Sequence, residues 1–291
     1  MSLMGWLFKT LSTTGDEKRN NDTTPVTGVN CCEDIPYGKN SKWNLLNVYY
    51  PVKTCDPLPT IVSIHGGGYV YGTKETYHHY CADLARRGFT VVNFTYRLAP
   101  EHKFPVPLED TNAVMQWIVQ NAGTYYIDPG SIFLVGDSAG AQLASQYAAI
   151  ATNSEYAKHF DFAFPPVNIR AVGLNCGMYE IADLKKTFLK GLYGDYIDRK
   201  IPDTDPRMQV LTNVTGSFPP AHITTACNDF LKENAEPLCD LLVAKGVDAQ
   251  VKCYGTPEQK HIGHVFHVDI RNPEATQCND EQCAFFRKYL R

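Results

Sequence analysis

Residues 131–146 read SIFLVGDSAGAQLASQ, and this stretch decides the fold. The apolar run at 132–135 is typical of a buried strand, and the alanine-rich segment at 139–151 is typical of a helix. Between them, residues 136–140 match G-x-S-x-G, a pattern that places a serine on a sharp strand-to-helix turn. The motif makes Ser138 a candidate nucleophile. The alternative is an exposed serine in an ordinary tight turn.

A second glycine motif lies earlier in the chain. Residues 65–68 read HGGG, directly after the apolar run TIVSI at 60–64. Consecutive glycines leave their backbone N–H groups unobstructed, and such groups can stabilise a developing oxyanion. The alternative is a flexible glycine turn. Because both motifs directly follow a predicted strand, we favour a catalytic interpretation of the pair.

Four motifs together resemble a known family. They are HGGGY at 65–69, YRLAPE at 96–101, PLED at 107–110 and GDSAG at 136–140. In this order they resemble the hormone-sensitive-lipase-like branch of the α/β-hydrolases, which contains many bacterial acetyl esterases and carboxylesterases. The resemblance extends from about Trp43 to the C-terminus. Residues 1–30 and 176–220 match by position only.

The resemblance implies a catalytic triad. Ser138 takes the position of the nucleophile, Asp229 that of the acid and His264 that of the base. The chain order of serine, acid and histidine is the order of the α/β-hydrolase fold. Val265 stands where the family has a glycine after the histidine.

The resemblance also implies an oxyanion hole. The backbone N–H groups of Gly67, Gly68 and Ala139 take its three positions. The family uses no cofactor and no metal, so none is expected here.

Other acidic residues offer alternatives to this assignment. Glu233 and Asp240 could replace Asp229, but they fall within the following predicted helix rather than at the strand end. Asp137 adjoins Ser138, and we expect its side chain to point away from the nucleophile. A structural role is also expected for three residues of the other motifs: Arg97, Glu101 and Asp110.

The histidines have alternatives as well. His261, His264 and His267 recur every three residues, which is one way to build a three-histidine metal site. We favour packing or partly exposed positions for His261 and His267, because their neighbours offer no evident partners to orient metal ligands. We expect His65 to anchor the glycine loop rather than to act as a base.

Strand and helix patterns alternate along the chain. Strands are predicted at 43–52, 60–64, 90–96, 132–135, 169–175, 221–226 and 249–254, with helices between them and at the C-terminus. This alternation predicts the α/β class, with a mostly parallel sheet covered by helices on both faces.

Two segments interrupt the alternation of strands and helices. Leu3, Leu7 and Leu11 predict a short amphipathic helix within residues 1–13, followed by a polar loop at 14–25. Residues 176–220 contain no strong strand pattern, and Leu184, Phe188 and Leu192 predict a helix there. We therefore expect residues 1–30 to form an N-terminal part of a small cap. Residues 31–291 would then form the hydrolase domain, with the cap insertion at about 176–220.

Composition excludes several classes of function. Lys and Arg number 27 against 31 Asp and Glu, and this net charge of −4 argues against a general nucleic-acid partner. Neither a membrane span nor a signal peptide is apparent, so we expect a cytoplasmic protein without integral membrane association. The ten scattered cysteines are expected to be reduced and mostly buried. The sequence leaves open whether the chain forms a homo-oligomer.

The expected activity is that of a serine esterase acting on small, short-chain, acetyl-type esters through an acyl-enzyme intermediate. Tyr179, Tyr193 and Tyr196 would line the site from the cap. One alternative is an amidase or arylformamidase that uses the same triad. Another is a non-catalytic ligand-binding member of the fold.

Overall fold

A computed structural model describes residues 1–290. Its centre is an eight-stranded sheet in the order β1-β2-β4-β3-β5-β6-β7-β8. The strands are β1 (Val29–Pro36), β2 (Leu45–Pro51), β3 (Leu58–Ile64), β4 (Thr90–Phe94), β5 (Ile127–Asp137), β6 (Ile169–Asn175), β7 (Ala221–Ala226) and β8 (Ala249–Tyr254). β2 pairs antiparallel with both β1 and β4, and the remaining neighbours pair in parallel. The predicted α/β class with a mostly parallel sheet is confirmed.

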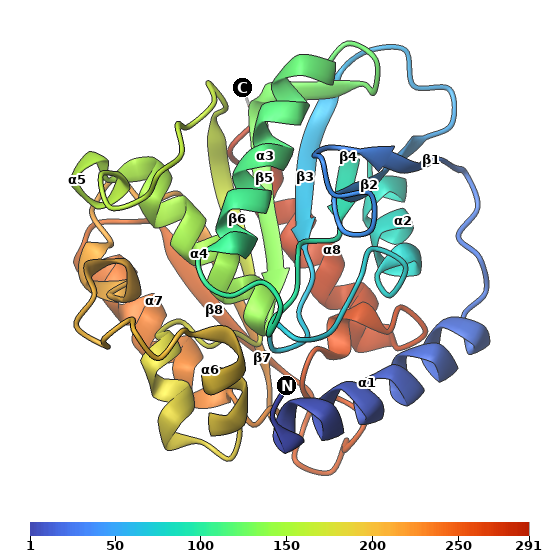
Figure 1. The fold of residues 1–291 in the computed structure, drawn as a ribbon. Helices are drawn as coiled ribbons and strands as arrows, with labels where there is room; N and C mark the ends of the chain where they lie inside the picture. Colours follow the sequence, from blue (N-terminus) through green and yellow to red (C-terminus); the bar gives the residue numbers. More distant parts are fainter. Residues whose placement is uncertain (291) are drawn as a thin grey trace.

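Helices cover both faces of the sheet (Figure 1). They are α1 (Leu3–Asp22), α2 (His78–Arg86), α3 (Val106–Asn121), α4 (Ala139–Thr152), α5 (Ser154–Ala157), α6 (Lys190–Tyr196), α7 (Ala235–Ala244) and α8 (Pro273–Arg287). Apolar side chains of α3, α4 and α7 pack in one buried cluster, and those of α2 and α8 pack in a second. The inner parallel strands, such as β3 and β6, are buried from both sides, which explains why their sequences are largely apolar, whereas the edge strand β8 is mostly half-buried or exposed.

Helix α1 crosses the end of the sheet toward which β3 and β5 point, and its first turn lies beside α6 (Figure 1). Ser2 anchors this end, because its N–H and hydroxyl groups donate to Asp195 at 2.7 Å each. Near the other end, Arg19 donates to the Thr76 carbonyl at 2.8 Å. Helix α1 and the segment around α6 therefore both lie over the carboxyl ends of the strands.

The structure corrects three local predictions. The prediction of a polar loop at 14–25 is wrong for residues 14–22, because α1 continues to Asp22. The helix expected around Leu184, Phe188 and Leu192 is divided into a 3₁₀ turn at Ile181–Lys186 and the helix α6. Strand β1 was not predicted. No helix among residues 1–290 is both long and apolar enough to span a membrane.

Candidate active site

Ser138 lies at the turn between β5 and α4. Its backbone has φ 51° and ψ −117°, which is rare for a residue with a side chain. The turn is tight because β3 passes close to it: a Cβ on Gly140 would lie 2.0 Å from the Ile64 carbonyl oxygen. Glycine is therefore required at this end of the motif, and the strained turn holds the serine at the carboxyl end of the central strand.

His264 and Asp229 complete a hydrogen-bonded chain with Ser138. The Nε2 atom of His264 lies 3.0 Å from Ser138 Oγ, and its Nδ1 atom lies 2.7 Å from Asp229 Oδ1. Asp229 follows the end of β7, and His264 lies on the loop after β8. The structure thus brings together the three side chains that the sequence resemblance selects.

The carboxylate of Asp229 is held by several donors. Thr225 Oγ1 donates to Oδ2 at 3.0 Å, and the Leu231 N–H donates to Oδ1 at 2.9 Å. Burial by itself would raise the pKa of Asp229. The hydrogen bond and charge of His264, together with the Leu231 N–H, outweigh burial and lower this pKa below its ordinary value. Asp229 is therefore an anion suited to orienting and stabilising a histidinium.

Cys176 is a neighbour that the sequence motifs did not indicate. It follows the end of β6, with φ 50°, and its Sγ atom lies within 4.8 Å of ligand atoms of Asp229 and His264. Burial raises the pKa of Cys176 well above its usual range, so the thiol stays neutral beside the carboxylate. The sequence could have indicated Cys176 by its position directly after a predicted strand, because parallel strands bring their carboxyl ends to one edge of the sheet.

The glycine loop after β3 faces the serine. Gly67 has φ 105°, and a Cβ there would lie 2.1 Å from the Tyr71 carbonyl oxygen, so only glycine fits. Among residues 1–290, no loop or turn carbonyl accepts a hydrogen bond from the N–H groups of Gly67, Gly68 or Ala139. Ala139 is the first residue of α4, where the helix dipole favours negative charge. These N–H groups are therefore available to an acceptor beside Ser138.

His65 supports that loop. Its ring is fully buried, stacks on Tyr96 with centroids 4.0 Å apart, and has Nδ1 at 2.8 Å from the Gly66 carbonyl oxygen. Burial lowers the pKa of His65 to about 4, so the ring is neutral at ordinary pH. It is part of the loop's framework and makes no contact with Ser138 in the hydrogen-bond network.

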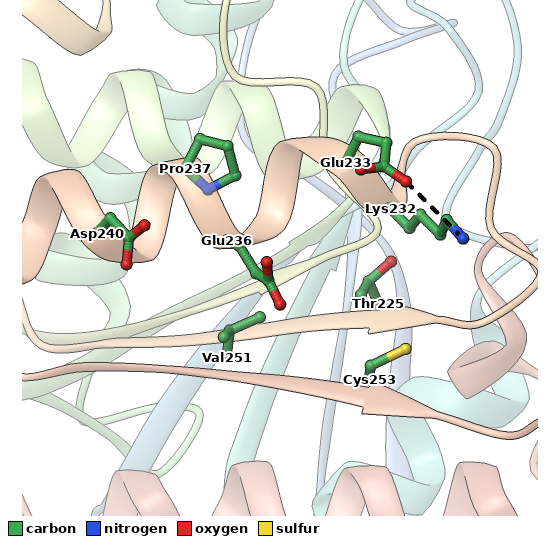
Figure 2. A pocket seen from close by; sticks show the side chains of 8 residues that line it. All are labelled: Thr225, Lys232, Glu233, Glu236, Pro237, Asp240, Val251 and Cys253. Carbon is green, nitrogen blue, oxygen red and sulfur yellow. Dashed lines mark ion pairs between the residues drawn. The ribbon is translucent and has the colours of Figure 1, made fainter.

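The alternative acids lie elsewhere. Glu233 and Asp240 line a separate cavity of about 460 Å³ between α7 and the strands β7 and β8 (Figure 2). Asp137 accepts a hydrogen bond from the Tyr77 hydroxyl at 2.7 Å. In the motif YRLAPE, Arg97 pairs with Asp110 at 2.8 Å and with Glu109 at 3.3 Å; neither partner is Glu101.

The three histidines do not share a cluster. Among residues 1–290, the groups of three metal-ligand side chains include neither His261 nor His267. His267 is fully buried and packs edge-on against Tyr80. Cys176, Asp229 and His264 do form such a group, but both ring nitrogens of His264 already contact Asp229 and Ser138. The arrangement favours proton transfer over metal binding.

Two cavities meet at Ser138. One, of about 20 Å³, is apolar and is lined in part by Phe8, Met178, Leu184, Leu189 and Leu192. The other, of about 180 Å³, has a mixed lining, in which Ser12, Asp16, Arg19 and Tyr71 supply polar groups. The tyrosines expected to line the site do not do so. Tyr179 and Tyr196 are buried in the protein interior, and the Tyr193 hydroxyl donates to Asp203 at 2.5 Å.

Known proteins are similar to this chain in sequence. A family profile described as alpha/beta hydrolase fold matches residues 61–267. Carboxylesterase NlhH of Mycobacterium tuberculosis is 30% identical over 84% of this chain and 78% of its own length. The acetyl esterase of Salmonella typhi is 28% identical over 81% of this chain and 73% of its own.

A solved structure is also similar. Esterase B from Lactobacillus rhamnosis, inhibited by a C4-C4 SN3 tributyrin phosphonate, is 27% identical and superposes with a TM-score of 0.87. The superposition covers 96% of this chain and 92% of that one.

Proposed function

Because the chain belongs to the α/β-hydrolase family and is a carboxylic ester hydrolase like its relatives, we propose that it cleaves short-chain esters through an acyl-enzyme on Ser138. The observation that carries the proposal is the 3.0 Å contact between Ser138 Oγ and His264 Nε2 beside a small apolar cavity. In this proposal α1 and residues 176–220 form the cap of the hydrolase domain, since both supply residues to that cavity.

In the proposed mechanism His264 accepts the Ser138 proton as Oγ attacks the ester carbonyl. Asp229 fixes the imidazole tautomer and stabilises the histidinium. The N–H groups of Gly67, Gly68 and Ala139 bind the oxyanion, and one such donor is typically worth on the order of a hundredfold in turnover. His264 then protonates the leaving alcohol. Water attacks the acyl-enzyme by the same route and releases the acid.

The size of the apolar cavity supports a short acyl group. At about 20 Å³ it has room for roughly one water-sized group, which is the size of an acetyl methyl. Phe8 of α1 and Leu192 of α6 both line it and are packed in the apolar interior. A longer acyl chain would have to displace these side chains. The phosphonate that inhibits esterase B carries C4 chains, which are also short although larger than this cavity.

The polar groups in the larger cavity at Ser138 support a leaving alcohol that carries hydroxyl groups. Arg19 Nη1 lies 2.5 Å from Asp16 Oδ1, and the Tyr71 hydroxyl donates to Asp16 Oδ2 at 3.0 Å. Each of these groups has further hydrogen-bonding capacity. The alkyl chain of an aliphatic alcohol would remove water from these side chains without offering them a hydrogen-bond partner, which is unfavourable.

A series of p-nitrophenyl esters tests the proposal, with Ser138→Ala as the matched variant. We expect kcat/KM to peak between acetyl and butyryl and to fall to near background in Ser138→Ala, while the circular dichroism spectrum is unchanged. A peak at lauryl or palmitoyl would refute the acyl-chain proposal. Retained hydrolysis in Ser138→Ala would refute the nucleophile. An aryl formamide, assayed beside the esters, measures amidase activity.

We also propose a cytoplasmic location. Its support is that all ten cysteines are free thiols, as is usual in a reducing compartment. Fractionation of cells that express the chain at native level would test it, with recovery in the membrane or secreted fraction as the contrary result.

A further inference from the structure

The cysteines fall into two groups. Five are buried, and five are exposed or half-buried, so the expectation of mostly buried thiols is wrong for half of them. Cys227 and Cys253 belong to the second group, and their Sγ atoms lie 3.6 Å apart. They are distant in sequence but adjacent at one edge of the sheet, where β7 and β8 pair in parallel.

The sheet register explains why the two thiols meet. Thr225 pairs with Cys253, and Cys227 follows two residues after Thr225, so both cysteines project from the same face. The Cys227 N–H donates to the Tyr254 carbonyl at 2.9 Å, which extends the pairing past the end of β7. A disulfide needs an S–S distance of about 2.05 Å, so the sulfur atoms would have to approach by roughly 1.5 Å. Rotation of side chains covers part of that distance, and backbone movement covers the rest.

Solvent has access to the pair. Cys253 is exposed and lines the cavity of about 460 Å³ between α7 and the two strands, so a small oxidant such as a peroxide can reach it first. Figure 2 shows its side chain beside Thr225, with Lys232 at the end of the same cavity. Burial and the neighbouring Cys227 raise the pKa of Cys253 to about 11, and the charge of Lys232 opposes this rise. The thiol is therefore mostly protonated at neutral pH, and the reactive thiolate fraction grows as the pH rises toward 11.

Cys227 is close to the proposed triad acid. Asp229 is two residues further on, and the intervening Asn228 is held by hydrogen bonds to the carbonyls of Thr256 and Gln259 at 3.0 Å each. Asn228 also forms a β-bridge with Gly263, the residue before His264. If Cys227 moved toward β8, the segments that carry Asp229 and His264 would therefore be displaced as well.

We propose that Cys227 and Cys253 are an oxidation site, at which a peroxide forms a reversible disulfide that lowers ester hydrolysis. The Cys253 thiolate attacks one peroxide oxygen and the O–O bond breaks, which gives a sulfenic acid and hydroxide. The hydroxide takes up the proton that the thiol released on ionisation and becomes water. The Cys227 sulfur then attacks the sulfenic sulfur, and its proton leaves with the hydroxyl group as a second water. Two thiols are oxidised by two electrons while one peroxide is reduced to two waters. A dithiol reverses the reaction.

The disulfide itself does not depend on the proposed function, whereas its effect on hydrolysis does. The first test is therefore chemical. Trypsin separates the two cysteines into peptides 208–232 and 253–260, and Cys239 lies in neither. After treatment with hydrogen peroxide at a mildly alkaline pH, we expect a linked pair of these peptides that disappears on reduction. Absence of this linked pair from the oxidised wild type would overturn the proposal.

The second test measures activity. Misplacing a catalytic group by about 1 Å can cost on the order of a hundredfold, so we expect kcat to fall at least about tenfold on oxidation and to recover with dithiothreitol. Cys253→Ser should keep the reduced activity and resist the loss. Cys55→Ser, which removes another exposed thiol, should respond like wild type. A linked peptide pair with unchanged kcat would overturn the effect on hydrolysis. An unoxidised enzyme without esterase activity would instead overturn the proposed function.

Discussion

The Nδ1 atom of His264 lies 2.7 Å from Oδ1 of Asp229, whose side chain is fully buried. The pKa of this carboxyl is lowered despite burial, so Asp229 carries a negative charge. That charge favours uptake of a proton by His264 at Nε2, the ring nitrogen that faces Ser138. Geometry and charge both favour Asp229 as the acid of the proposed triad.

Asp229→Asn is expected to lower kcat by on the order of 10³–10⁴, because an amide can hold the imidazole in the wrong tautomer. The measurement is steady-state hydrolysis of p-nitrophenyl acetate. Glu233→Gln and Asp240→Asn are matched controls, since both acids line the separate cavity beside α7, and each should stay within a few-fold of wild type. A large loss in either control, with Asp229→Asn active, would reassign the acid.

Leu192→Ala is expected to lengthen the preferred acyl chain. Removing this buried side chain enlarges the apolar cavity at Ser138, and each methylene that fits is worth about 1–3 kcal/mol in discrimination. The hexanoyl-to-acetyl ratio of kcat/KM should rise at least about tenfold. Both substrates are assayed on one sample, so partial unfolding does not alter the ratio. Leu11→Ala, on the exposed side of α1, is the control, and an unchanged ratio in Leu192→Ala would contradict the acyl assignment.

Asp137→Asn is expected to change how stability depends on pH. Burial raises the pKa of Asp137 from its usual value near 4 to about 7, despite the opposing effects of Tyr77 and His264. The folded state therefore binds this proton more tightly than the unfolded state, and wild-type stability from this group is lost as pH rises from about 4 to 7.

The neutral amide avoids that loss. The Tm of Asp137→Asn minus that of wild type should therefore increase between about pH 5 and pH 8, by a few degrees or on the order of 1 kcal/mol. Thermal melts across this range measure the difference, with the exposed Asp56→Asn as control. A difference that is constant or shrinks with pH would show that Asp137 does not titrate in this way.

Val265 allows a test of backbone strain. It has φ 54° and ψ 30°, the left-handed region that a β-branched residue rarely adopts. Val265→Gly relieves the strain, whereas Val265→Ala keeps it and loses methyl contacts. We expect the glycine variant to be the more stable of the two by about 1 kcal/mol, the reverse of their order in a helix. Urea unfolding of both variants would reveal the opposite order if the strain were absent.

The parallel core could be predicted from the sequence because its strands contain short β-branched or apolar runs that alternate with helix patterns. Strand β1 could not: the register shifts between Cys32 and Ile35, and Asp34 between them has φ 54°, so the bulge breaks any alternation of polar and apolar residues. As an edge strand it is also largely exposed. The position of β1 depends on its pairing with β2, and a local sequence pattern carries no information about that pairing.

The extent of α1 depends on tertiary contacts in the same way. Its second half is polar, and it is held by the contacts of Asp16 with Tyr71 and of Arg19 with Thr76. The residues of the proposed triad could be selected from the sequence, Ser138 by its motif, Asp229 by the strand before it and His264 by the family resemblance. The residues that line the two cavities could not be predicted from the sequence. Phe8, Asp16 and Arg19 come near Ser138 only because the fold brings α1 across the end of the sheet.

Helix α1 supplies Phe8 to one cavity and Ser12, Asp16 and Arg19 to the other, all within a single stretch of 20 residues. The proposed catalytic residues Ser138, Asp229 and His264 lie far later in the chain, after β5, β7 and β8. In the proposed function, contacts with the substrate from α1 and the catalytic residues therefore belong to different parts of the polypeptide. Exchange of this one contiguous segment between relatives is then expected to change both cavities at once, while Leu184, Leu189 and Leu192 keep their part of the smaller one.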